Sequence, residues 1–276
     1  MASFSSPRYD DLVDKLEKIH IVDPNTGNIL PYGPKKLYEV INELKSKIDQ
    51  LGILSAKAQY LNNILTSFDK LDQDTQLFII LDPNQSPMHK NTIRPEAFGG
   101  FARISKRRLF LLAPNLSSGK EKSSGLPYIQ MNPKCLCDFY VKEKLQRNGL
   151  GVCLIQAALR FYTEKEKRSV QIHELAFELP SEALTTFLST KFFLTEPTMH
   201  PNSFVVYPNF FESNSNNKVQ NTKTKPQPKS KYLVPDKYIR TTRKCKTENF
   251  VASNHRITKN CQSDSFYNIF GIVKAN

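Results

Sequence analysis

The chain has 276 residues, of which 39% are hydrophobic, and it carries a formal net charge of +13. No apolar run reaches the roughly 18 residues that a helix needs to cross a bilayer, and the first residues lack a secretory signal, so the sequence predicts a soluble intracellular protein without a membrane partner. The charge is uneven: residues 213–276 contain 13 Lys/Arg and 3 Asp/Glu, a net +10, which leaves +3 for residues 1–212.

The first part of the chain is predicted to contain a short strand followed by two helices. Residues 18–22 form an extended stretch. Apolar residues recur at i, i+3 and i+4 spacing over 34–50, which predicts an amphipathic helix. Gly52 is expected to interrupt this helix, and a second helix is predicted over 54–68.

The next part of the chain is predicted to supply strands. Residues 76–81 are a compact apolar run and predict a buried strand. The segments 98–104 and 109–113 are expected to form a hairpin across a turn at 105–108. The stretch 114–133 is rich in Ser, Gly and Lys and is predicted to be a polar loop.

A glycine-bearing loop follows the predicted strand 135–141 and leads into a predicted helix over 149–167. Its pattern is Gln146-x-x-Gly149-x-Gly151. Free backbone N–H groups at a helix N-terminus suit a phosphate or pyrophosphate, and a side chain at either glycine would hold that group away from the backbone. The spacing matches neither GxGxxG nor GxxxxGK[ST]. Taken alone, it is weak evidence, because a helix entry that binds no ligand can have the same pattern.

The rest of the predicted domain alternates strand and helix. Strands are predicted over 173–179 and 203–207, and a helix over 182–190 follows Pro180-Ser181. This order predicts an α/β (α+β) fold with a mixed central sheet flanked by helices, which includes a right-handed βαβ crossover. We expect one domain over 1–212 and a basic, mostly disordered tail over 213–276.

Four blocks of sequence, in order over about residues 19–211, resemble the α-tubulin N-acetyltransferases of the GCN5-related acetyltransferase (GNAT) superfamily. The first is Leu51-Gly-Ile-Leu-Ser-Ala-Lys-Ala-Gln59-x-Leu61. The second is Cys135-x-x-Asp138-Phe-Tyr-x-x-Glu143-x-x-Gln146-Arg147-x-Gly149-x-Gly151. The third is Leu175-Ala-x-x-x-Pro180-Ser181 with Phe187-Leu188, and the fourth is Asn202-x-Phe204-Val205 with Phe210-Phe211.

The resemblance implies a GNAT fold and the transfer of an acetyl group from acetyl-CoA, the co-substrate, to a luminal-loop lysine of α-tubulin in microtubules. It also implies a cytoplasmic protein of the cytoskeleton, including the cilium or flagellum. The implied catalytic residues are Cys135 and Glu178. The implied acetyl-CoA contacts are Gln59, Phe139, Tyr140, Val141, Lys142, Glu143, Lys144, Leu145, Gln146, Arg147, Asn148, Gly149, Leu150, Gly151, Val152, Ser181, Glu182, Ala183, Leu184, Thr185, Thr186, Phe187, Leu188, Ser189 and Thr190.

The chain departs from the family pattern at two places. Glu178 stands where the family usually has aspartate, which moves the carboxylate by about one bond length. The segment 181–190 lacks the basic residues that the family often has there, which would leave less positive charge near the phosphates of the coenzyme.

The proposed roles have simpler alternatives. Glu178 could be the base that deprotonates a lysine, or a solvated or helix-capping carboxylate. Cys135 could act on the proton of the amine or merely pack, and Cys135 with Cys137 would be reduced core thiols on one strand face. Gln59 could be a surface amide, and Arg147 is expected to pair with phosphate. The five cysteines lack the spacing of a zinc site, so we expect no metal.

Two other functions remain open from the sequence. The chain could acetylate another protein lysine or an N-terminal amine, or it could be a non-catalytic microtubule-binding protein. The basic tail suits an acidic partner, and because no nucleic-acid-binding motif accompanies it, tubulin is favoured over nucleic acid. The chain is expected to be a monomer.

Overall fold

A computed structural model describes residues 9–85, 88–89, 92–112, 128–200 and 202–214. The helices are α1 (Tyr9–Leu16), α2 (Pro34–Tyr38), α3 (Ile41–Ala58), α4 (Leu150–Glu166), α5 (Glu182–Phe192) and α6 (Phe210–Asn214). The strands are β1 (Ile19–Val22), β2 (Thr75–Leu81), β3 (Met88–His89), β4 (Thr92–Ile93), β5 (Phe98–Lys106), β6 (Leu109–Leu112), β7 (Tyr128–Met131), β8 (Lys134–Val141), β9 (Ala176–Glu178), β10 (Thr198–Met199) and β11 (Phe204–Val206).

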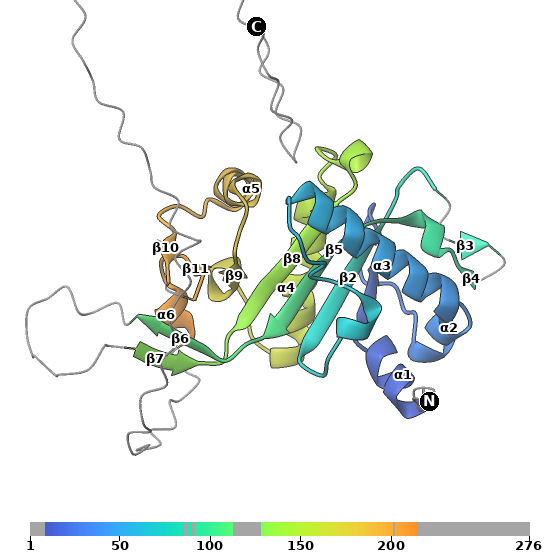
Figure 1. Cartoon of the computed structure of the whole chain (residues 1–276), viewed down its shortest axis with the longest axis horizontal. Coiled ribbons are helices and arrows are strands. Elements are labelled where there is room, and N and C mark those ends of the chain that lie inside the picture. Colours follow the sequence, from blue (N-terminus) through green and yellow to red (C-terminus); the bar gives the residue numbers. More distant parts are fainter. Residues whose placement is uncertain (1–8, 86–87, 90–91, 113–127, 201, 215–276) are drawn as a thin grey trace, which may run out of the picture. The chain divides into compact units, whose positions relative to one another are not determined.

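A seven-stranded sheet in the order β1-β2-β5-β8-β9-β11-β10 forms the centre of the domain (Figure 1). β1 pairs with β2, and β8 with β9, in parallel, whereas β2–β5, β5–β8, β9–β11 and β10–β11 are antiparallel. The chain returns from β8 to the parallel strand β9 through α4, which is the predicted crossover. The mixed sheet flanked by helices confirms the predicted fold class.

Helices cover the two faces of this sheet, as Figure 1 shows for α3 and α4. The side chains of α4 pack with one set of strand residues, which includes Phe78, Ile104 and Leu136. The side chains of α3 pack with the alternate set, which includes Leu77 and Tyr140. Because successive side chains of a strand point to opposite faces, both faces are apolar, and β2 and β8 are buried along their whole length.

The predicted helices over 34–50 and 54–68 are wrong in their division. The break comes earlier, between α2 and α3, and α3 continues through Gly52 to Ala58. A tertiary contact requires glycine at this position of the helix, because a Cβ there would lie 1.8 Å from the backbone oxygen of Thr66. The segment that the prediction made helical beyond residue 60 is instead an irregular chain that passes against α3.

The predicted hairpin of 98–104 and 109–113 is also wrong. β5 pairs on its two sides with β2 and β8. β6 pairs with β7, which lies inside the stretch predicted as a loop. The predicted strand 173–179 is shorter than expected, because Ile172–Glu174 form a 3₁₀ helix, η5, before β9 begins.

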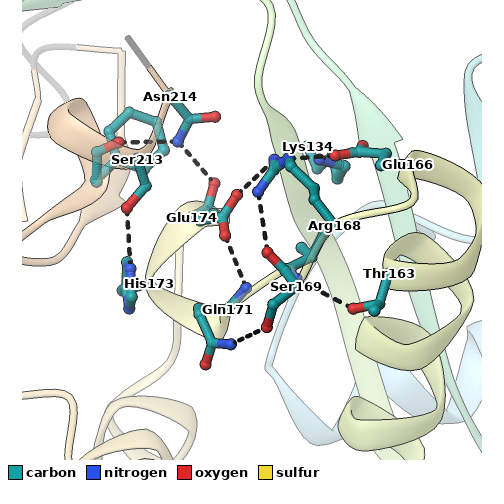
Figure 2. A network of polar contacts seen from close by, with 12 residues as sticks. Lys134, Thr163, Glu166, Arg168, Ser169, Gln171, His173, Glu174, Ser213 and Asn214 are labelled. Atoms are coloured by element: carbon teal, nitrogen blue, oxygen red, sulfur yellow. Dashed lines mark hydrogen bonds and ion pairs between the residues drawn. The ribbon is translucent and has the colours of Figure 1, made fainter. Parts of the chain in front are cut away.

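A polar network ties α6 to η5 and to the end of α4 (Figure 2). The Asn214 amide donates to the Glu174 backbone oxygen at 3.2 Å, and Arg168 Nη2 lies 2.7 Å from Glu174 Oε2. Asn214 is buried, so the folded part extends beyond the domain boundary predicted at residue 212. The predicted disordered tail lies outside the described residues from 215 onward. Within the part of the chain that the structure describes, none of the helices has the length and apolar content needed to cross a membrane.

Candidate functional site

Strands β8 and β9 separate after only two paired positions, Cys135 with Ala176 and Leu136 with Phe177. β9 ends at Glu178, whereas β8 continues to Val141. The pairing of β8 with β5 also shifts register here, because Arg103 pairs with Asp138 but the next residue of β5 pairs with Leu136. Cys137 is therefore the extra residue of a bulge, which bends a strand locally. The result is an opening in the sheet on the β9 side of β8.

The loop that follows β8 is held in place by side-chain hydrogen bonds. Gln146 Nε2 donates to the Val141 backbone oxygen at 2.8 Å, and the Tyr140 hydroxyl donates to Glu143 Oε2 at 2.9 Å. Gly149 has φ of +79° and is the N-cap of α4. Glycine adopts this left-handed conformation without steric cost, so the loop ends with the first N–H groups of α4 exposed to a ligand.

A groove of about 410 Å³ lies at this helix N-terminus. Gly151 is on its floor, where a Cβ would meet the Phe139 and Phe187 rings at 3.2 and 3.3 Å. A larger side chain would therefore push the two rings apart. The residues that line the groove are Val141, Gln146, Arg147, Gly149, Gly151, Val152, Ala183, Thr186, Phe187, Thr190 and Lys191.

A second, smaller pocket of about 20 Å³ lies where β8 and β9 part. It is lined by residues of the end of α3, β8, β9 and the start of α5, namely Gln59, Leu136, Cys137, Asp138, Phe139, Tyr140, Glu178, Leu179, Pro180, Ser181 and Leu184. Glu178 Oε2 is buried and accepts no hydrogen bond from the described residues. A buried carboxylate oxygen without a donor is uncommon and fits a group that receives a proton from a ligand.

The two pockets account for most of the residues singled out from the sequence, but not for all of them. The predicted contacts that line neither pocket are Lys142, Glu143, Lys144, Leu145, Asn148, Leu150, Glu182, Thr185, Leu188 and Ser189. Several of these have structural places instead: Leu145, Leu150 and Leu188 belong to the apolar core. Within residues 9–214, apart from the gaps given above, no three His, Cys, Asp or Glu residues are grouped to hold a metal ion.

Sequence reasoning missed two residues of this region. Lys191 lines the groove one residue beyond the segment judged to lack basic residues, because α5 runs to Phe192. Asp138 is buried on β8 and accepts three side-chain hydrogen bonds, two from the end of α3 and one from the segment that follows it. The signal for Asp138 was a carboxylate in an otherwise apolar strand, which is rare unless the charge is paired or hydrogen-bonded.

The Asp138 carboxylate joins α3 to β8. Oδ1 accepts from the Ser55 hydroxyl at 2.7 Å and from Gln59 Nε2 at 3.0 Å. Oδ2 accepts from the Thr66 hydroxyl at 2.6 Å. Gln59 is the C-cap of α3, and these bonds turn its amide toward the smaller pocket instead of solvent.

Cys135 lies beneath the smaller pocket instead of lining it. Its side chain has no exposed surface, and Sγ donates to the Pro133 backbone oxygen at 3.6 Å. Burial raises the pKa of this thiol far above its ordinary value, and the charge of Glu178 adds to the increase. Cys135 and Cys137 are both free thiols. A catalytic role for Cys135 stays a prediction.

The chain is similar in sequence to known proteins. Residues 12–237 match the family model described as "GNAT acetyltransferase, Mec-17". The chain is 34% identical over 182 residues to the alpha-tubulin N-acetyltransferase of Schistosoma japonicum, covering 64% of this chain and 61% of that protein. It is 27% identical over 206 residues to alpha-tubulin N-acetyltransferase 2 of Caenorhabditis briggsae, covering 74% and 65%. It is 29% identical over 201 residues to alpha-tubulin N-acetyltransferase 1 of Danio rerio, covering 72% and 59%. The chain thus matches about six tenths of the length of these relatives.

Proposed function

We propose, from the premise that this chain belongs to the Mec-17 family of GNAT acetyltransferases, that it moves an acetyl group from acetyl-CoA to a luminal-loop lysine of α-tubulin in microtubules. The relatives named alpha-tubulin N-acetyltransferase support the choice of tubulin as the substrate. One structural observation carries the proposal: the groove at the N-terminus of α4 lies next to the pocket that contains Glu178, and α5 and β8 border both.

The groove suits the coenzyme in shape and charge. Gly151 leaves room that a side chain would fill, and the first N–H groups of α4, with the positive end of its dipole, favour a diphosphate. Arg147 and Lys191 would add positive charge. The edge of β8 that separates from β9, near Phe139, would hold the pantetheine arm by backbone hydrogen bonds. When bound, acetyl-CoA supplies the activated acyl group.

Glu178 would make the acceptor amine reactive. The ammonium group of lysine loses its proton only near pH ~10.4, so a base must take that proton at neutral pH. The Glu178 carboxylate lies at the end of β9 with an oxygen that accepts no bond from the described residues, and a carboxylate is an ordinary general base. Gln59 and Asp138 would fix the wall of the pocket opposite to Glu178.

The tail and the cellular site follow from the same proposal. The net charge of +10 over 213–276 would attract the acidic surface of a microtubule at long range. The protein would act in the cytoplasm on the cytoskeleton, as a monomer and without a metal.

Mass spectrometry of tubulin tests this function. The protein is incubated with acetyl-CoA and polymerised microtubules, and acetyl-lysine is mapped on α-tubulin. Acetylation at a luminal-loop lysine, faster on polymerised than on free tubulin, is the expected result. Acetylation of other proteins but not of α-tubulin would show that the proposed substrate is wrong. If a folded sample transfers no acetyl group to any protein, the proposed enzymatic function is rejected.

A further inference from the structure

Cys137 and Glu178 are neighbours on the same face of the sheet where the strands part. They occupy the position directly after the last register pair, Leu136 with Phe177. Cys135 and Cys137 both belong to the cluster that contains Ala176. Glu178, two residues after Ala176, shares its face because strand side chains alternate. Cys137 and Glu178 both line the smaller pocket, whereas Cys135 does not.

The carboxylate of Glu178 has an apolar neighbour on one side and the thiol on the other. Phe204 of β11 pairs with Glu178 and is buried. Among the described residues, the titratable or charged groups that interact with the pair are Cys135 of β8, Arg103 of β5, Arg107 of the turn after β5 and Tyr162 of α4. Burial lowers the pKa of Arg107, but its hydrogen bond with Cys137 and the charge of Glu178 outweigh this effect and raise it.

The thiol of Cys137 is a donor rather than a nucleophile. It is 2% exposed, and burial, together with the charge of Glu178, raises its pKa to about 11. At neutral pH it therefore carries its hydrogen. That hydrogen can reach the Cys135 backbone oxygen, 3.4 Å from Sγ, or the carboxylate of Glu178, because it rotates about the Cβ–Sγ bond.

We propose that Cys137 is a positioning residue for the acetyl transfer, whose S–H donates to the Glu178 carboxylate and turns it toward the incoming amine. The proposal rests on the proposed function. The carboxylate accepts one proton from the lysine ammonium and becomes a neutral acid. The thiol of Cys137 then donates its hydrogen bond to the Cys135 backbone oxygen again. The freed amine nitrogen then bonds to the acetyl carbon as the C–S bond of the thioester breaks, and coenzyme A leaves as a thiol that takes up the second proton of the amine. No bond to the sulfur of Cys137 forms or breaks, so Cys137 carries no acetyl group.

Infrared spectroscopy tests the contact without any turnover. The S–H stretching band of Cys137 is obtained as the difference between the wild-type spectrum and that of Cys137→Ser. Glu178→Gln replaces the charged acceptor with a neutral one and is expected to shift this band toward that of a weaker hydrogen bond. Cys153, a half-buried free thiol of α4 that lines neither pocket, is the control. Its band, obtained in the same way from Cys153→Ser, should not shift in Glu178→Gln. A Cys137 band that is identical with and without Glu178→Gln would overturn the contact.

The pH dependence of kcat/KM tests the role in the reaction. Removing a donor from a carboxylate favours its protonated form, so Cys137→Ala should move the acidic limb to higher pH and lower kcat/KM about 3–10-fold near pH 6. The KM for acetyl-CoA should not change. Cys137→Ser keeps a hydroxyl donor and should restore most of the profile, and Cys153→Ala should match the wild type. If the acidic limb of the kcat/KM profile of Cys137→Ala lies at the same pH as in the wild type, the proposed role of Cys137 is overturned. A wild type that transfers no acetyl group yet shows the infrared shift would reject the proposed function and establish the contact alone.

Discussion

The side-chain amide of Gln59 donates a hydrogen bond of 3.0 Å to Oδ1 of Asp138, which joins the last turn of α3 to β8 at the smaller pocket. The same amide donates to the Ser55 hydroxyl at 2.8 Å. Two residues that are 79 positions apart in the chain thereby form one wall of the proposed acetyl site. The position of α3 on the sheet is thus coupled to the shape of the pocket.

Asp138→Ala should destabilise the domain strongly. The hydroxyls of Ser55 and Thr66 are fully buried and donate to this carboxylate. Leaving such donors unpaired costs roughly 1–3 kcal/mol for each group, so we expect the free energy of unfolding in urea to fall by about 2–5 kcal/mol. Asp69→Ala removes a carboxylate from an exposed position and should change it by less than about 0.5 kcal/mol. Equal losses in the two variants would contradict the network.

Gly52→Ala should also destabilise the domain, although alanine is the better helix former. The added Cβ would lie 1.8 Å from the Thr66 backbone oxygen, and overpacking of this kind costs about 1–3 kcal/mol. Gly33→Ala is the matched control, because nothing lies within 4 Å of a Cβ at that position. Denaturant unfolding should show a lower midpoint for Gly52→Ala only. A more stable Gly52→Ala would mean that the chain at Thr66 does not pack on α3.

Gly151→Val should abolish the binding of acetyl-CoA while the domain stays folded. The valine would displace the rings of Phe139 and Phe187 and fill the floor of the groove. Calorimetric titration with acetyl-CoA should give heat with the wild type and none with Gly151→Val. Nothing lies within 4 Å of a Cβ at Gly33, so Gly33→Val should bind acetyl-CoA like the wild type. Undiminished affinity in Gly151→Val would place the coenzyme elsewhere.

Glu178→Gln should slow acetyl transfer without weakening the coenzyme complex. The amide keeps the size of the side chain but cannot take a proton, and loss of a general base typically costs about 10²–10⁴-fold in rate. The measurement is kcat/KM for the lysine substrate across pH, with the acetyl-CoA affinity measured in parallel. Glu164→Gln, on an exposed position of α4, is the control. A pH–rate profile unchanged by Glu178→Gln would remove Glu178 from the role of base.

The stability of the domain should fall as the pH drops below about 6.5 partly because of His200. Its Nδ1 accepts a hydrogen bond from the Leu112 backbone N–H at 3.1 Å, and burial lowers its pKa from the ordinary value of 6.5. Below about pH 6.5 His200 therefore binds a proton in the unfolded chain but not in the folded chain, so acid favours unfolding. His200→Asn keeps an acceptor near Leu112 and should lose less stability between about pH 7.5 and about pH 5.5. Because His20 shifts in the same direction in both proteins, its contribution cancels. Identical losses would contradict a buried neutral His200.

Much of the site was predictable because its residues are close together in the sequence. The strand–loop–helix unit from Cys135 to the end of α4 depends on local patterns: an apolar strand, two glycines and a helical periodicity. The resemblance to a GNAT family, now confirmed by the match over residues 12–237, added Gln59 and Glu178, which no local pattern would have connected. The role of each side chain is still a prediction.

Several features of the fold and the site could not be predicted from the sequence, because they depend on contacts between segments that are distant in the chain. Glycine weakens a helix, so Gly52 led to the prediction of a break. The helix continues through Gly52, and the backbone of Thr66 lies where a side chain at this position would be. The pairing of β6 with β7 instead of β5 is a choice among partners that composition does not determine. The juxtaposition of Cys137 and Glu178 depends on the register of two parallel strands and on a bulge, and neither is encoded in a periodicity. Lys191 was missed by one residue, an ordinary error at a helix end.

The most direct test of the account is a crystal structure of the protein with acetyl-CoA. We predict the diphosphate at the N-terminus of α4 beside Gly149 and Gly151, and the thioester in the opening between β8 and β9, next to Glu178. Coenzyme bound away from this groove, or a groove closed by the rings of Phe139 and Phe187 in the presence of saturating coenzyme, would contradict it.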